Sequence, residues 1–193
     1  DTTVSFKCSQ EYFSYSGQPI HPKIIEDLTT WLSDGGDQVV SISLDDSQQC
    51  NRYFGDIKIK PIEGENPYIF YRKEGRCFGY QYIGNTDSGV NVLGISESGG
   101  GSGIFKSLLF VKIEEDLGIT FNDNTNVMKD DRKRILVKKL GSVILGDRYS
   151  GEIKIERNRL LIGKDTGHFA NGSERNRIIE IDISSNSNGN MSQ

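Results

Sequence analysis

The sequence predicts a mainly β fold, an antiparallel β-sandwich or barrel-like sheet of about ten strands with one N-terminal amphipathic helix. Short stretches of alternating apolar and polar residues recur at intervals of roughly 8–15 residues, as they do in sandwiches and barrels. The 193 residues include 22 glycines but only four prolines, which indicates tight turns between short elements. A helical apolar period occurs in one place, so an alternating βαβ architecture is not expected.

The helix is predicted for residues 22–34. Its apolar residues recur at helical spacing and form one stripe, which consists of Ile24, Ile25, Leu28, Trp31 and Leu32. Pro22 suits the first turn of a helix, where a missing backbone N–H costs nothing, and Gly35-Gly36 supplies the stop. We expect this stripe to pack in the core.

After the helix the apolar period changes to two, as in strands. Strands are predicted at residues 39–44, 53–61, 67–71, 77–83, 90–95, 104–113, 118–121, 134–139, 142–145, 152–156, 160–162 and 178–183. The run 104–113 is apolar on both faces, so it is expected inside a sheet, with the glycine cluster Glu97–Gly103 as the loop before it. Lys73–Arg76 and Arg157–Arg159 are predicted to be hairpin turns.

We expect one β-rich domain over residues 1–183, followed by a polar tail at 184–193. The Ser- and Asn-rich composition of the tail is typical of a disordered or surface segment. The alternative is two subdomains with a boundary near 116–131. The charge balance changes there, from 8 basic and 14 acidic residues in 1–100 to 15 basic and 13 acidic residues in 101–193.

Charge and hydropathy argue against two classes of partner. The net charge is −4, and the basic cluster Lys129–Lys139 is interrupted by Asp130 and Asp131, so we expect no nucleic-acid binding. This cluster is predicted to be a solvated turn and strand edge, where lysines oppose edge-to-edge pairing. Because the chain has no run of 18 apolar residues, we expect no membrane span either.

The expected location is secreted or periplasmic. The chain begins at Asp1 without an initiator Met, which fits an exported protein whose leader has been removed, or a trimmed chain. Its three cysteines show no CxxC spacing, and in an oxidising compartment one disulfide is predicted among three pairings. We favour Cys8–Cys50, which would tie the N-terminus to the loop after the first strand. Three unpaired thiols, Cys77 among them, are the alternative.

No motif for a cofactor or a metal has the required spacing. The glycine cluster leads into a strand, and Lys106 stands where a dinucleotide-binding motif needs its third glycine. Gly163-Lys164 resembles the end of a P-loop but is followed by an aspartate. Asn122–Asn126 resembles a calcium loop without its first carboxylate, so it is predicted to be an Asx turn. With two histidines and no paired cysteines, zinc motifs are excluded, and no cofactor or metal is expected.

The leading functional hypothesis is a non-catalytic binding or interaction domain for a protein or carbohydrate ligand. Aromatic residues and arginines, which are enriched at recognition surfaces, concentrate between residues 52 and 82. The predicted ligand-binding residues are Arg52, Tyr53, Arg72, Tyr80 and Tyr82, with the Glu97–Gly103 loop at their rim. The alternative is that cross-strand aromatic pairs only stabilise the sheet.

Two other classes of function stay open. A hydrolase would use His168 or His21 with nearby carboxylates, although neither histidine lies in a catalytic motif. A structural accessory protein is compatible with the β content and the polar tail. The sequence gives no prediction for the oligomeric state.

Overall fold

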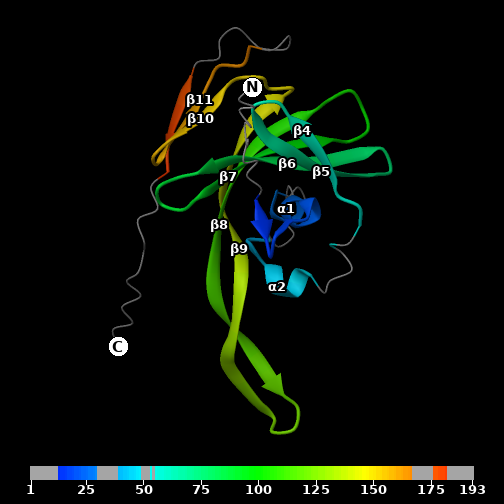
Figure 1. Ribbon diagram of the computed structural model, residues 1–193, viewed down its shortest axis with the longest axis vertical. Coiled ribbons are helices and arrows are strands. Elements are labelled where there is room, and N and C mark those ends of the chain that lie inside the picture. Colours follow the sequence, from blue (N-terminus) through cyan, green and yellow to red (C-terminus); the bar gives the residue numbers. More distant parts are fainter. Residues whose placement is uncertain (1–12, 30–38, 49–52, 54, 167–175, 182–193) are drawn as a thin grey trace, which may run out of the picture.

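The computed structural model describes residues 13–29, 39–48, 53, 55–166 and 176–181 (Figure 1). The helices and strands in this part of the chain are β1 (Ser14–Tyr15), β2 (Gln18–Pro19), α1 (Pro22–Thr29), β3 (Ser41–Ser43), α2 (Leu44–Ser47), β4 (Lys58–Ile62), β5 (Glu65–Lys73), β6 (Arg76–Asn85), β7 (Asn91–Ser98), β8 (Phe105–Asn122), β9 (Val127–Asp147), β10 (Ile153–Glu156), β11 (Arg159–Ile162) and β12 (Arg177–Glu180). None of the described helices has the length and hydropathy needed to cross a bilayer.

The strands form three antiparallel sheets. The main sheet has seven strands in the order β3-β9-β8-β7-β6-β5-β4, so β4 to β9 form a continuous meander. β10, β11 and β12 form a smaller sheet, and β1 pairs with β2. The predicted mainly β, antiparallel fold is therefore confirmed and its layers are sandwich-like, whereas none of the described sheets closes into a barrel.

Two pairs of predicted strands are each one continuous strand. β8 contains the segment predicted at 118–121 and all but the first residue of the segment predicted at 104–113. β9 runs through Gly141, where two strands were expected to join. Every residue of β8 has a pairing partner on β9. β9 is three residues longer, one for each of three register shifts along the pair. Such bulges let a strand absorb an extra residue without breaking its pairing, and the local alternation does not reveal this.

The prediction of a single helix is not confirmed. α1 lies within the predicted segment and ends at Thr29, while residues 30–34 lie outside the described part of the chain. A second helix, the short α2, occupies positions where a strand end and a polar loop were predicted. Ser43 caps it, with Oγ accepting from the Asp46 N–H at 3.2 Å, and two aspartates occupy its first turn, where the helix dipole favours them.

The predicted turns have the expected chemistry. Glu74 and Gly75 both have positive φ angles, 51° and 81°, as a two-residue hairpin turn between β5 and β6 requires. Asn122 Oδ1 accepts backbone N–H groups from Asn124 at 3.0 Å and Thr125 at 3.3 Å. The Asx turn is therefore confirmed, and it closes the β8–β9 hairpin.

Apolar side chains bury both faces of the main sheet. On one face, Ile25 and Leu28 of α1 pack on the sheet in a cluster that includes Leu93 and Leu109. On the other face, the β10–β12 sheet covers a second cluster that includes Val92 and Leu108. Because side chains alternate along a strand, neighbouring residues of β7 and β8 enter different clusters. The strands in the middle of the main sheet are therefore apolar on both faces, as predicted for residues 104–113.

The β8–β9 hairpin extends past both of these layers as a two-stranded arm (Figure 1, bottom). β8 pairs with β7 as far as Val111, and β9 pairs with β3 from Leu136 to Lys138. We call residues 115–135 the β8–β9 arm, because their strands pair only with each other in the part of the chain that the structure describes.

Tyr80 of β6 links the main sheet to the N-terminal segment. Its side chain is fully buried, and its hydroxyl donates to the carbonyl of Ile20 at 2.6 Å and lies 3.3 Å from the carbonyl of Phe13. The Phe13 ring meets the Tyr80 ring edge-on, with centroids 6.3 Å apart. A buried carbonyl that loses its donor is costly, so this hydroxyl holds the segment in place.

Replacing Tyr80 by Phe should therefore lower the free energy of unfolding by about 1–3 kcal/mol, because the Ile20 carbonyl stays buried without its donor. Urea unfolding followed by circular dichroism measures the change. Tyr68→Phe is the control, since the Tyr68 hydroxyl is only partly buried and its bond to Ser96 is longer, 3.2 Å. Equal losses from both variants would contradict the role given to Tyr80.

Candidate functional site

Strand alternation divides the predicted ligand-binding residues between the two faces of the main sheet. Tyr80 and Tyr82 face the N-terminal layer, where the Tyr82 ring stacks on Phe13 with centroids 6.1 Å apart. Arg72 lies on the opposite face, with its guanidinium 5.6 Å from the centre of the Phe70 ring. The aromatic window 52–82 is therefore not one surface.

Two of the five tyrosines in this window bond to the helix α1. The Tyr53 hydroxyl donates to Asp27 of α1 at 2.9 Å, and the Tyr71 hydroxyl donates to Glu26 of the same helix. Arg52 lies outside the described residues. A ligand contact by the five predicted residues stays a prediction. Tyr82 is the one of them in the lining of the cleft described next, although its ring stacks on Phe13 on the other face of the sheet.

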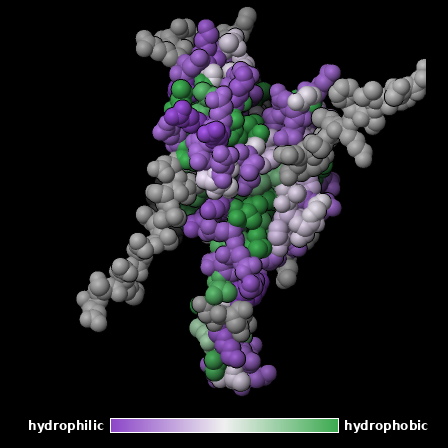
Figure 2. All heavy atoms as spheres, turned by 60° about the vertical axis from the view of Figure 1, so that its left-hand side comes forward, coloured by the Kyte–Doolittle hydropathy of each residue, from purple (hydrophilic) through white to green (hydrophobic). Residues whose placement is uncertain are grey.

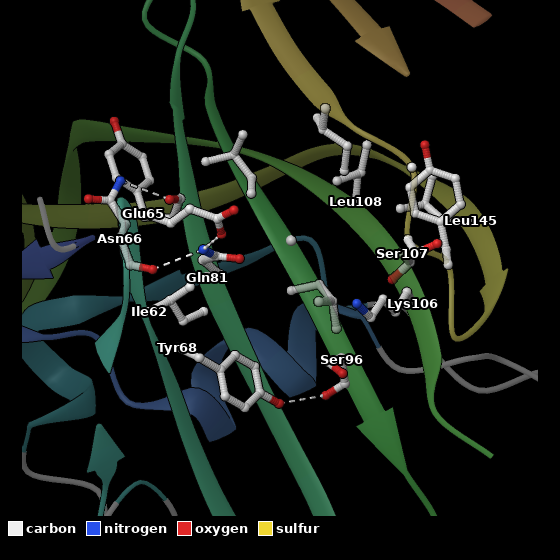
Figure 3. A pocket seen from close by; sticks show the side chains of 18 of the residues that line it. Ile62, Glu65, Asn66, Tyr68, Gln81, Ser96, Lys106, Ser107, Leu108 and Leu145 are labelled. Atoms are coloured by element: carbon white, nitrogen blue, oxygen red, sulfur yellow. Dashed lines mark hydrogen bonds between the residues drawn. The ribbon is translucent and has the colours of Figure 1, made fainter. Parts of the chain in front are cut away.

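An open cleft of about 890 Å³ lies on the face of the main sheet that carries the β10–β12 sheet (Figure 3). It crosses the strands from β4 to β9 and is bounded by the segment 149–153 that leads into β10. Its polar lining includes Lys60, Glu65, Asn66, Tyr68, Gln81, Ser96, Lys106 and Glu152.

The cleft exists because the small sheet covers only part of this face. Along β7, Val92 lies under the small sheet, whereas Gly94 and Ser96 on the same face line the cleft. Along β8, Leu108 borders the covered region and Lys106 lies in the open one. The residue type thus changes from apolar to glycine and polar at the limit of the apolar cluster.

Gln81 lies at the centre of a hydrogen-bond network in the cleft (Figure 3). Its Nε2 donates to Glu65 Oε2 at 2.7 Å and to the carbonyl of Asn66 at 2.9 Å. The Asn66 side-chain nitrogen in turn donates to the carbonyl of Tyr82 at 3.0 Å. These bonds use both amide hydrogens of Gln81 and orient its carbonyl oxygen as an acceptor.

Tyr68 forms an aromatic wall at one end of the cleft. Its ring stacks on Phe70 with centroids 5.3 Å apart and planes 16° apart, and its hydroxyl donates to the Ser96 carbonyl at 3.2 Å. Burial, together with the nearby Cys77, raises the pKa of Tyr68, so the hydroxyl stays protonated at neutral pH. The wall requires glycine at position 79, because a Cβ there would lie 2.6 Å from Tyr68 Cζ.

The charges around the cleft are balanced. Lys60 and Lys106 are opposed by Glu65 and Glu152, and Glu152 also pairs with Lys154 at 3.0 Å. No three His, Cys, Asp or Glu side chains converge into a metal-binding group among the residues that the structure describes. In the lining, amide, hydroxyl and aromatic side chains outnumber the charged ones, and they suit a neutral ligand that forms many hydrogen bonds.

His21 lies away from the cleft, beside the start of α1. Its side chain is buried, and Nδ1 accepts the backbone N–H of Lys23 at 3.1 Å. Burial, and then the positive charge of Lys23, lower the pKa of His21, while the backbone of Gly55 acts in the opposite direction. His168 lies outside the described residues, so a hydrolase that uses either histidine stays a prediction.

The disulfide between Cys8 and Cys50 stays a prediction, because both cysteines lie outside the described residues. Cys77 of β6 is a half-buried free thiol next to Tyr68.

Sequence reasoning missed most of the cleft. The predicted site consisted of aromatic residues and arginines. Asn66, Gln81, Ser96 and Lys106 were not among them, because the strands that carry them were predicted from their apolar residues. One signal was present in the sequence. Gly94 and Ser96 follow Val90 and Val92 on one face of the predicted strand, and such a change from apolar to small and polar residues indicates that part of the face is uncovered.

Gly79→Ala should lower the free energy of unfolding by about 1–3 kcal/mol, because the new Cβ meets atoms that cannot move freely. It would lie 2.5 Å from Phe70 Cβ and 2.6 Å from the Ile69 carbonyl oxygen. Urea unfolding measures the loss. Gly101→Ala is the matched control, since a Cβ at this exposed loop position meets nothing within 4 Å, and it should change stability by less than about 0.5 kcal/mol. Comparable losses in both variants would contradict the packing argument.

The lowered pKa of His21 predicts a loss of stability in mild acid. The unfolded chain binds a proton on His21 at the usual pKa of 6.5, whereas burial in the folded protein opposes protonation. Neutral His21 therefore costs no stability above that pH, and the free energy of unfolding decreases as the pH falls below it. Urea unfolding at about pH 7 and about pH 5 should show a smaller loss for His21→Gln than for the wild type. His168→Gln controls for the other histidine, and an unchanged loss in His21→Gln would refute the prediction.

Comparisons of this chain with protein-family models, with curated proteins and with solved structures found no match. Its function must therefore be inferred from the chemistry of its own residues, and the cleft of about 890 Å³ is the concave site considered for it.

Proposed function

We propose that this protein is a non-catalytic binding domain whose ligand lies in the cleft between the main sheet and the segment leading into β10. The observation that carries the proposal is the combination of an open cleft of about 890 Å³ with a lining of oriented amide and hydroxyl groups. Binding sites commonly join a concave surface to a few polar groups held in fixed directions.

The ligand that this lining favours is neutral and rich in hydroxyl groups, as an oligosaccharide is. The Gln81 side chain is held by Glu65 and by the backbone of Asn66, so its orientation is set before a ligand arrives. The Tyr68 ring offers a flat apolar surface beside these polar groups. The two lysines and two glutamates cancel, so a strongly charged ligand would gain little attraction.

The fixed positions of the lining side chains favour ligand binding over catalysis. The lining side chains come mainly from paired strands of one sheet, where backbone hydrogen bonds fix their positions.

We also propose an extracytoplasmic location, which agrees with a Cys8–Cys50 disulfide and with a carbohydrate ligand. This location predicts one disulfide among the three cysteines, and counting free thiols on the denatured, unreduced chain tests it. Three free thiols would contradict the disulfide.

The cleft can be tested by filling it. A Cβ at Gly94 comes close to the flexible end of Ile83, whose Cδ1 lies 3.3 Å away, and lies at an ordinary contact distance of 3.8 Å from the Gln81 carbonyl oxygen, so Gly94→Leu should fold and place its side chain in the cleft. The full chain should bind neutral oligosaccharides on a glycan array that also displays anionic ones. Calorimetry with the best neutral oligosaccharide should show an affinity loss of at least about tenfold in Gly94→Leu.

Gln81→Ala is a second test that adds no bulk, and it should weaken binding because the oriented acceptor is removed. Gly101→Leu, in the open loop before β8, is the control and should bind as the wild type does. Circular dichroism verifies that each variant is folded. The proposal fails if the wild type binds no neutral oligosaccharide, or if Gly94→Leu and Gln81→Ala, both folded, keep the wild-type affinity.

A further inference from the structure

The β8–β9 arm exposes an apolar stripe on one face. Leu117, Ile119 and Phe121 alternate along β8, and Met128 of β9 pairs directly with Phe121, so the four side chains share that face. Their exposed fractions are 50%, 67%, 50% and 69%, and apolar residues are visible along the projecting arm in Figure 2. We call these four residues the arm stripe.

The arm stripe continues the face that α1 covers in the body of the protein. Leu109 and Val111 of β8 are buried in the cluster beneath α1, and Ile113 packs partly against the same cluster. The same alternation then leads through Glu115 into the arm stripe, beyond the reach of the helix. A two-stranded ribbon with an uncovered apolar face is marginal in water, and a covering layer would stabilise it.

The edges of the arm are less suited to a partner than its face. On β9, Ile135 N–H donates to Asp45 Oδ2 at 2.7 Å and Arg132 pairs with Asp46, so α2 covers the edge near the base of the arm. A register shift next to Gly118 also distorts the pairing there. Charged side chains and bulges are the features by which sheet edges avoid adding strands.

The charge of the arm argues against an anionic membrane as the partner. Residues 115–135 contain five acidic and four basic residues, so the arm carries no basic excess to attract anionic lipids. On the stripe side, Lys133 is already neutralised by Glu115 at 2.8 Å. Asp130 pairs with Ile119 and so shares this face by register, which leaves one net negative charge per copy. Two identical arms therefore meet against only a weak repulsion, which salt screens at an exposed surface.

The area of the arm stripe fits a weak pairing of two copies. A large side chain offers roughly 150–250 Å², so four that are 50–69% exposed present on the order of 400 Å² per copy. With their flanking side chains they approach the low end of protein–protein interfaces, about 600 Å² per partner. Such an interface predicts a dimer that dissociates in the micromolar range or above.

We propose that the arm stripe is a self-association surface, and that its occupant is the arm stripe of a second copy of this chain. The two arms pack face to face and point in opposite directions. A same-direction pairing would bring two α1 layers together, because α1 stands on the stripe side of the sheet at the base of the arm. The inference does not depend on the cleft, which lies on the opposite face.

Sedimentation velocity of the full chain, from about 1 to 500 μM, should show a reversible monomer–dimer equilibrium. The double variant Ile119→Ser/Phe121→Ser should raise the dimer dissociation constant by at least about tenfold, because two large apolar groups leave the interface. Circular dichroism and thermal unfolding establish that the variant is folded. A second variant, Met128→Ser, tests the same face from β9 with a smaller change.

Val127→Ser is the matched control. Val127 is 44% exposed in the same hairpin but pairs with Asn122, so it lies on the other face and should leave the dissociation constant unchanged. The proposal is overturned if the wild type is monomeric throughout, or if Val127→Ser weakens the dimer as much as the stripe variants do. Sedimentation with phosphatidylcholine–phosphatidylglycerol vesicles tests the membrane alternative, and stripe-dependent vesicle binding by a chain that stays monomeric would also overturn it.

Discussion

The pairing of β8 with β9 is the constraint on which the rest of the structure depends. Every residue of β8 has a partner on β9, and both covering layers pack on the part of this hairpin that lies in the body. The N-terminal segment, with α1, buries one face and the β10–β12 sheet buries the other. The same hairpin also carries the arm, so one ribbon supplies the centre of the core and the most extended surface of the molecule.

The two candidate surfaces arise from the same mismatch between a large sheet and small covering layers. β10, β11 and β12 are each four residues long and cannot cover a seven-stranded sheet. The uncovered area is polar in the cleft and apolar on the arm. A polar uncovered face needs no partner to be stable in water, whereas an apolar one gains from being covered. For this reason we assign the polar cleft to a ligand and the apolar arm stripe to association.

The sequence predicted the local features of this fold better than its long-range ones. The hairpin turn at Glu74-Gly75 and the Asx turn at Asn122 depend on neighbouring residues, and both were predictable. The continuity of β9 through Gly141 was not, because pairing along the whole of β8 overrides the local break. The cleft depends on which part of a face the small sheet covers. That is a tertiary property, of which Gly94 and Ser96 give only a local trace.

The position of β3 at the edge of the main sheet has a consequence for the order of folding. The strands from β4 to β9 pair with their neighbours in sequence, so each can join the sheet as soon as it is synthesised. β3 instead pairs with β9, through contacts such as Ser43 with Leu136, and must wait for a long stretch of later chain. Until then α2 lacks its contacts with β9, and the edge of the growing sheet stays open. Closing that edge is thus a late step, in which the beginning of the chain locks a meander that is already assembled.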